Sequence, residues 1–411
     1  MRNDTRGRRP LRTRGPAWRV LLVAVSLLGV LFTTRPAHAY AWMIRHGYSG
    51  CPVCHADPSG GETLTAYGRA QSDLLLRTRW DGKNPEEAEP SKASNFLWFL
   101  ETPPSLLLGG SVRLATAYTD KISVFPMQLD AYGQLRVGKV LVGGGLGVIK
   151  VPASSPYGRT AQVTTAQGEA YNLISRTHYL GYDFDGQYTL RAGRLNLPFG
   201  LRIPEHTMWV RQATRTDRES GGQHGVALAY NAETLRGEVM AILGNYQINP
   251  DMYRERGYSA FLEVMAGSRA AFGVSSFYTY AKRDRVTLES NIARGAHGVF
   301  TRLALADPLA LLAEADIMTD STRSLGYVGF VQADYEVIQG LHGLVTFEWL
   351  DQGYLKSAQM QNEPRTKGAG QTEVAPWFSA DWFFLPHMDV RADFIIRPDN
   401  FEFLGQFHAF L

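Results

Sequence analysis

Residues 127–137 read MQLDAYGQLRV, and this stretch decides the class of fold. Its odd-numbered positions are apolar or small, whereas its even-numbered positions are polar or Tyr. Because successive side chains of a strand point to opposite faces, this period of two predicts a β-strand with one apolar and one polar face. Residues 390–396, VRADFII, begin with the same alternation, so the pattern recurs along the chain.

About sixteen runs of this kind can be placed beyond residue 104, and their connections alternate between short and long. The runs span residues 106–118, 125–137, 139–151, 170–183, 186–196, 223–231, 234–246, 256–266, 269–281, 295–306, 309–318, 325–337, 340–350, 373–384, 388–396 and 401–411. The short links lie at Gly138, Asp185, 232–233, Gly267, 307–308, Gln339 and 386–387, and long ones at 152–169, 197–222, 282–294 and 351–372.

This loop pattern separates a membrane barrel from a soluble sandwich, which would also alternate. Outer-membrane barrels combine an even strand number with short periplasmic turns and long outer loops. The sequence therefore predicts a mainly β fold, an antiparallel transmembrane β-barrel of about 16 strands over residues 105–411. Both of its ends would lie on the periplasmic side of a bacterial outer membrane, with lipid around the barrel.

Further features near the strands agree with this prediction. Residues 401–411 alternate to the end of the chain, which resembles the terminal strand of outer-membrane proteins, with Leu411 where Phe is usual. Beyond the first 39 residues no apolar stretch reaches the roughly 18 residues that suggest a spanning helix. Aromatic residues near strand ends are predicted to form interfacial girdles, among them Tyr118, Trp349, Trp377 and Trp382.

The polar face of these runs is dense in charge, and it is predicted to face the barrel lumen. It includes Arg113, Asp130, Arg136, Arg191, Arg236, Glu238, Glu263, Glu314, Asp316, Asp334, Glu336, Glu348, Asp381, Arg391 and Asp393. The mixed signs favour cross-strand ion pairs. The acidic pairs Glu314 with Asp316 and Asp334 with Glu336 leave a second interpretation, in which they draw a metal cation inward.

Residues 1–39 are predicted to be a cleaved secretory signal. A basic beginning with seven Arg precedes the uncharged apolar run 20–32, an eighth Arg follows that run, and Ala37-His38-Ala39 is a cleavage site. Thirteen apolar residues fall short of the roughly 20 that span a bilayer as a helix. Removal of these residues takes eight Arg and one Asp, so the net charge changes from +3 to −4 and gives no reason to expect a nucleic-acid partner.

The segment Cys51-Pro52-Val53-Cys54-His55 contains both cysteines of the chain and is predicted to attach one haem c covalently. Two thiols three positions apart can form thioethers with the haem, and His55 is then the proximal iron ligand. The same spacing also suits a redox-active pair, half of a zinc site or a disulfide. Met43 and His46 are the candidates for the sixth iron ligand.

Residues 40–104 are predicted to be a small, mainly α-helical monohaem cytochrome c segment with a linker. Thr63 is the expected N-cap of a helix that includes Leu64, Tyr67, Ala70, Leu74 and Leu75, and 81–94 is a polar linker. About 60 residues make a poor independent core, and a covalent haem would supply the missing stabilisation.

The stretch 195–208 differs from an ordinary polar loop. It is long, aromatic and rich in Pro, so it is predicted to fold into the lumen as a constriction. His206 and Met208 in this stretch are candidate neighbours of the haem.

The chain resembles the fused cytochrome-porin family, which includes the iron-oxidising outer-membrane cytochromes. The resemblance combines a Cys-x-x-Cys-His motif in an exported chain, a Leu-x-x-x-Gly-Arg segment at 64–69 and a sixteen-strand barrel. In motif, the resemblance rests on Cys51, Cys54, His55, Gly68 and Arg69. It implies a haem in the barrel lumen or at its periplasmic side, and electrons that cross the outer membrane one at a time. Extracellular Fe(II) or another reductant would be the donor, as in an Fe(II) oxidase, and a periplasmic cytochrome the acceptor.

Two alternatives in other classes remain open. One is a diffusion porin or channel whose haem segment is a plug or redox sensor. The other is a purely structural barrel with a disulfide between Cys51 and Cys54. No acid, base or nucleophile for catalysis is apparent in the sequence.

Overall fold

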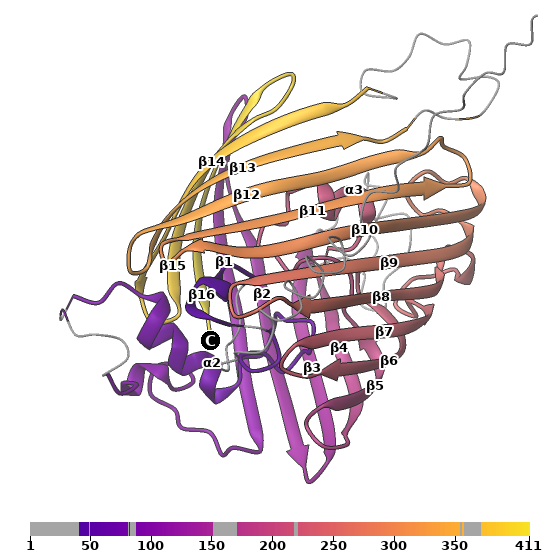
Figure 1. The fold of residues 1–411 in the computed structure, drawn as a ribbon. Coiled ribbons are helices and arrows are strands. Elements are labelled where there is room, and N and C mark those ends of the chain that lie inside the picture. The colour runs from indigo at the N-terminus through magenta and orange to yellow at the C-terminus, as the bar shows by residue number, and fades with distance from the viewer. Residues whose placement is uncertain are drawn as a thin grey trace, which may run out of the picture.

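The structure, a computed structural model, describes residues 41–48, 50–80, 82, 88–150, 171–217, 221–353, 356 and 371–411. Sixteen antiparallel strands within these residues form a closed barrel, because β1 pairs with β16 (Figure 1). They are β1(Leu106–Tyr118), β2(Ile122–Val137), β3(Val140–Lys150), β4(Tyr171–Asp183), β5(Tyr188–Leu195), β6(Gln223–Asn231), β7(Leu235–Gly244), β8(Arg256–Met265), β9(Ala270–Arg283), β10(Ser290–Ala306), β11(Leu309–Asp320), β12(Gly326–Ile338), β13(Leu341–Asp351), β14(Glu373–Leu385), β15(Met388–Ile396) and β16(Phe401–Phe410). The predicted mainly β barrel is confirmed.

Most strand ends lie within a few residues of the predicted runs. The main difference is β10, which begins at Ser290 rather than 295, so part of the expected long link 282–294 is strand. The predicted signal, 1–39, and the link 152–169 lie outside the described residues, as does most of the link 351–372. Within the part of the chain that the structure describes, no helix is long and apolar enough to cross a membrane.

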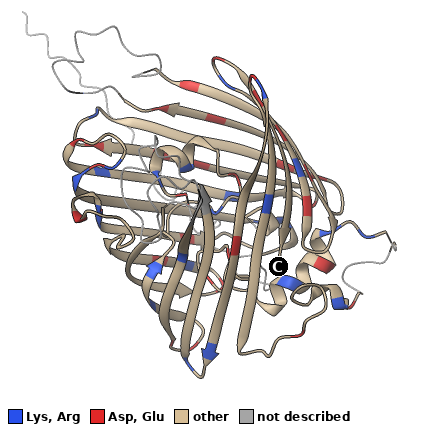
Figure 2. Ribbon diagram, turned by 180° about the vertical axis from the view of Figure 1, so that it is seen from behind, with Lys and Arg blue, Asp and Glu red and all other residues tan. Residues whose placement is uncertain are grey.

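The two faces of the barrel differ as the alternation predicts. Outward side chains are apolar and exposed, for example Leu180 at 60% and Val274 at 53%. Inward side chains such as Glu263 and Asp393 are charged and buried at 1% exposure, and acidic and basic residues recur along the strands in Figure 2. A soluble protein seldom exposes so continuous an apolar surface, whereas a barrel in lipid requires one. The strands therefore have the pattern of a membrane-spanning barrel.

The segment before β1 enters the lumen near the mouth where the short turns lie. It contains the 3-10 helix η2(Ala41–His46), the helix α2(Ala66–Gln71), the π-type turn η3(Ser72–Leu76) and the 3-10 turn η5(Lys92–Ser94). Figure 1 places α2 beside the chain's C-terminus. Side chains of this segment pack against the wall in one apolar cluster, Trp42, Met43, Tyr48, Leu64, Leu76, Ala310, Phe383 and Phe410. The small N-terminal segment therefore folds on the barrel wall rather than around a core of its own.

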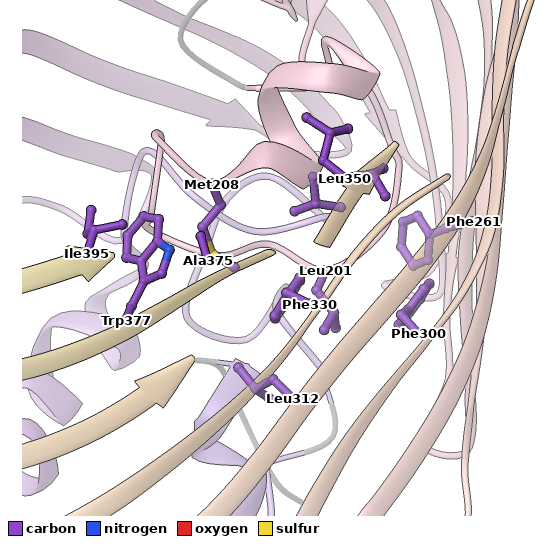
Figure 3. Close-up of a cluster of buried hydrophobic side chains, with 12 residues drawn as sticks. Leu201, Met208, Phe261, Phe300, Leu312, Phe330, Leu350, Ala375, Trp377 and Ile395 are labelled. Carbon is purple, nitrogen blue, oxygen red and sulfur yellow. The ribbon is translucent and has the colours of Figure 1, made fainter. Parts of the chain in front are cut away.

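The link between β5 and β6 also folds inward, as its composition predicted. It carries α3(Trp209–Thr214), and its Leu201, Met208 and Val210 are at most 2% exposed. These side chains pack on wall residues such as Phe330 and belong to the cluster drawn in Figure 3. The segment is thus held in the lumen by apolar burial.

Three details of the predicted pattern were wrong. Trp377 is buried in the lumen, where its indole N–H donates to Glu348 at 2.9 Å, so it is not part of a girdle. Arg136 lies at a strand end with 45% of its side chain exposed, beyond the packed lumen. The cap of α2 is Thr65 rather than Thr63, because Thr63 belongs to a short extended pairing that precedes the helix.

Candidate functional site

The Cys-x-x-Cys-His motif forms one tight turn inside the barrel. The backbone N–H groups of Cys54 and His55 both donate to the carbonyl of Cys51, at 3.2 and 3.0 Å. The two cysteines are free thiols with 7% and 4% exposure. This geometry brings both thiols and the imidazole of His55 onto one turn.

Helix α2 is hydrogen-bonded directly to this turn. The Thr65 hydroxyl donates to the carbonyl of Val53 at 2.6 Å and accepts from the N–H of Gly68 at 3.0 Å, so one side chain caps the helix and ties it to the motif. A Cβ on Gly68 would lie 2.3 Å from the carbonyl oxygen of Cys54. The helix approaches the motif backbone to backbone, and only glycine permits that approach.

A partly open cavity of about 100 Å³ lies next to the turn. Cys51 and His55 line it from the inward segment, while Cys54 is packed against Gly68 on α2. Its other walls include apolar and aromatic side chains, Leu64 and Tyr132 among them. In its chemistry the lining resembles that of cofactor pockets, which are mostly apolar with a few placed polar groups.

The charged groups of the cavity are four arginines, Arg113, Arg202, Arg236 and Arg302, and one carboxylate, Glu62. Arg236 donates to the sulfur of Cys51 at 3.1 Å and also binds Glu263. The same carboxylate accepts from Arg302 at 2.7 Å, so one Glu neutralises one of two adjacent guanidinium groups. Since guanidinium groups bind carboxylates well, this wall suits a ligand with anionic groups.

The loop after the motif is fixed by Asp57. Its carboxylate accepts from the backbone and hydroxyl of Ser59, both at 2.9 Å, and pairs with Arg191 of β5 at 3.3 Å. Although burial alone would raise the pKa of Asp57, Arg191 and Arg202 together with Ser59 hold it below its usual range. The carboxylate is therefore ionised and anchors the loop to the wall.

The cysteine environment bears on the alternatives for the motif. Burial, with a smaller contribution from Cys51, raises the pKa of the Cys54 thiol to about 12. A thiol that attacks disulfides needs a depressed pKa, because the thiolate is the nucleophile. The Cys54 thiol is therefore protonated at neutral pH and is not itself a nucleophile.

The two predicted sixth ligands lie elsewhere. Met43 is 1% exposed and belongs to the apolar cluster of the inward segment. His46 is near Glu336 and lines a different cavity, with its ring nitrogen 3.7 Å from the Glu336 carboxylate. Burial, then the charge of Arg45, lowers the pKa of His46 to about 4. The structure does not bring either residue to the cavity of His55.

The two candidate haem neighbours in the β5–β6 link lie at different places. Met208 is fully buried on the wall cluster. His206 lines an adjoining cavity and is held from both sides, by Arg113 at 2.8 Å and Asp217 at 3.1 Å. His206 is therefore close to the site but is committed to charged partners.

The predicted cross-strand ion pairs form, for example between Arg236 and Glu263 on neighbouring strands, and the inward segments add further partners. Glu314 is bound by Arg211 of α3 at 2.5 Å, and Asp334 by Arg45 of η2 at 2.7 Å. Arginines of the two inward segments, rather than cross-strand partners alone, therefore satisfy the wall carboxylates. Among the described residues no group of three His, Cys, Asp or Glu is placed to hold a metal ion.

One cavity residue was missed from the sequence. His408 of β16 lines the same cavity as His55. Its even position in the terminal strand places it on the inward face, so the predicted register contained the information that it points into the lumen.

Comparisons with known proteins address the barrel. No family model and no curated protein matches the chain. OmpT, an outer-membrane protein of Vibrio cholerae, is similar in structure at 10% sequence identity, with a TM-score of 0.53, and the match covers 76% of this chain and 99% of that one. The chain has the fold of an outer-membrane porin.

Two further outer-membrane structures, a channel and a porin, agree with that conclusion. The channel DcaP of Acinetobacter baumannii matches at 14% identity and a TM-score of 0.50, covering 74% of this chain and 97% of its own. The anion-selective porin from Comamonas acidovorans matches at 9% identity and 0.50, covering 75% and 99%. At these identities the likeness establishes the porin fold and leaves the function to the site.

Proposed function

We propose that this porin-fold chain is an outer-membrane electron-transfer protein that holds one haem c through Cys51 and Cys54, with His55 as the proximal iron ligand. The observation that carries the proposal is the motif turn inside the lumen, with Cys51 and His55 on the wall of one cavity. A bound haem would supply a one-electron redox centre.

The residues around the cavity fit such a group. Gly60 adopts φ +95°, and a Cβ there would come within 3.1 Å of the Cys51 sulfur, so the glycine keeps the space beside the thiol open. Leu64 and Tyr132 offer apolar surface for a flat macrocycle, and Arg113 and Arg202 offer partners for its carboxylates. The barrel itself separates the site from lipid.

The proposed partners follow from the resemblance to fused cytochrome-porins. Extracellular Fe(II) or another external reductant would donate electrons, and a periplasmic cytochrome would accept them. The protein's own groups would tune the potential, through burial of the site and the positive charge of Arg236 beside Cys51.

The test begins with covalent attachment. Outer membranes from cells that mature c-type cytochromes are separated on a denaturing gel and stained for haem peroxidase activity, with wild type beside Cys51→Ala and Cys54→Ala. Stain in the wild type that weakens or disappears in the variants, followed by prompt reduction on addition of Fe(II) to intact cells, is the expected result. An exported wild type without stain refutes the haem assignment; stain without reduction points to another donor or to a sensor.

A diffusion channel is the second candidate, and the structural neighbours taken alone favour it, since they include an outer-membrane channel and an anion-selective porin. The two inward segments of this chain oppose free diffusion, because they pack in apolar clusters on the wall. Planar bilayer recording separates the candidates. An electron conduit predicts little ion conductance, whereas steady porin-sized conductance would support the channel.

A further inference from the structure

His408 on the last strand is placed as a metal-ligating histidine would be. Its Nδ1 lies 3.0 Å from a carboxylate oxygen of Asp389 on the neighbouring strand β15. That contact selects the tautomer in which Nδ1 carries the proton, so Nε2 has the lone pair. Histidines that bind metals commonly donate their other ring N–H to a carboxylate, which fixes the ring and increases its basicity.

The second ring nitrogen of His408 faces an exchangeable partner. Nε2 lies 3.0 Å from the hydroxyl of Ser111 on β1, and both residues line the cavity that contains His55. A serine hydroxyl can rotate and accept or donate elsewhere, unlike a guanidinium group. The Nε2 lone pair can therefore be transferred from Ser111 to a metal in the cavity without loss of the bond to Asp389.

The other residues that could ligate the iron either lie outside this cavity or already have a charged partner. Met43 is buried in the apolar cluster and does not line the cavity, and His46 lines another cavity beside Glu336. His206, the other histidine near the site, receives a guanidinium N–H of Arg113 on its Nε2. Among these residues His408 is the one that shares the cavity of His55.

We propose that His408 is the second axial ligand of the haem, opposite His55, and that Asp389 is its positioning residue. This inference rests on the proposed function. It makes closure of the barrel part of the site, because the first ligand comes from the segment before β1 and the second from β16, which pairs with β1 only when the barrel closes. The iron would then be held by two imidazoles and would be low-spin.

Spectroscopy on the purified full-length holoprotein tests the assignment. The covalent haem stain is recorded first and reports the proposed function alone. Electron paramagnetic resonance and near-infrared magnetic circular dichroism then identify the axial pair in the wild type without any substitution. The variants are His408→Ala, His408→Met and Asp389→Asn, with His206→Ala as the matched lumen control and Met43→Ala and His46→Ala for the sequence-based candidates.

A bis-imidazole spectrum in the wild type is expected. His408→Ala should retain the stain, lose the low-spin signal and regain it with added imidazole; His408→Met should shift the near-infrared band and raise the potential. Asp389→Asn should shift the potential with His408 still bound, a change that a purely structural role would not produce. His206→Ala should have the same spectrum as the wild type.

Three results overturn the inference. A stained wild type that is high-spin or has a His/Met spectrum refutes His408 as ligand and leaves the haem proposal standing. So does a low-spin signal that survives in His408→Ala and disappears in Met43→Ala or His46→Ala. A wild type without stain instead refutes the proposed function, and this inference with it.

Discussion

Gly68 determines whether helix α2 can lie on the Cys-x-x-Cys-His turn, and Gly68→Ala is the sharpest test of that contact. A Cβ at this position would meet the carbonyl oxygen of Cys54 at 2.3 Å and its Cα at 2.9 Å. These atoms belong to the backbone of a turn fixed by its own hydrogen bonds, so they cannot rotate away as a side chain would. The helix must therefore move off the turn until the contact exceeds about 3 Å.

The energy of that movement can be bounded. Overpacking by one methyl group costs about 1–3 kcal/mol. If that cost falls on docking of α2, the undocked population rises about 5- to 150-fold. The hydrogen bond from Gly68 N–H to the Thr65 hydroxyl, 3.0 Å long, would lengthen at the same time.

Hydrogen–deuterium exchange of the purified barrel in detergent measures this effect. Peptides covering 50–76 should exchange faster in Gly68→Ala by about that factor, while peptides from β6–β10 should not change. Gly343→Ala is the control, because a Cβ there has nothing within 4 Å and should leave both regions unchanged. Equal exchange of 50–76 in Gly68→Ala and the wild type would refute the close approach of the helix.

Three further predictions concern the inward segments. Arg211→Ala leaves the buried carboxylate of Glu314 without its 2.5 Å partner and should destabilise the protein by about 3–5 kcal/mol in urea unfolding, whereas Arg269→Ala, in an exposed pair, should cost about 1 kcal/mol or less. Equal losses would show that burial of the pair is not what matters. Burial, then the charge of Arg45, lowers the pKa of His46 from 6.5 to about 4, so as the pH falls the undocked segment binds a proton before the docked one. Docking of the segment should therefore weaken as the pH falls from 6.5 to about 4, and its protection from protease should fall with it. An equal fall of that protection in His46→Gln would contradict this explanation. Replacement of 201–216 by a Gly-Ser linker removes the apolar link from the lumen and should raise single-channel conductance in planar bilayers, and an unchanged current would show that other residues block the pore.

The candidate site was only partly readable from the sequence. Cys51, Cys54 and His55 are adjacent in the chain, so their grouping on one turn is a local property, and the haem assignment itself stays a prediction. The inward direction of Glu263 or His408 also follows from strand register. Strand register does not predict which inward residues contact one another, because the partners are far apart in sequence. Arg236 contacts Cys51, and residues 111 and 408 contact each other only across the two strands that close the barrel.

The sequence by itself determined the barrel, its sixteen strands and most of their limits, because a period of two and the turn residues between runs are local properties of the chain. Tertiary structure alone decided what fills the lumen. Trp377 and Trp382 look alike as strand aromatics, yet Trp377 is 1% exposed against the inward link and Trp382 is 36% exposed on the barrel. The physical reason is that closure of the barrel fixes the distances between wall residues, and burial of apolar surface on that wall then selects where the two inward segments lie.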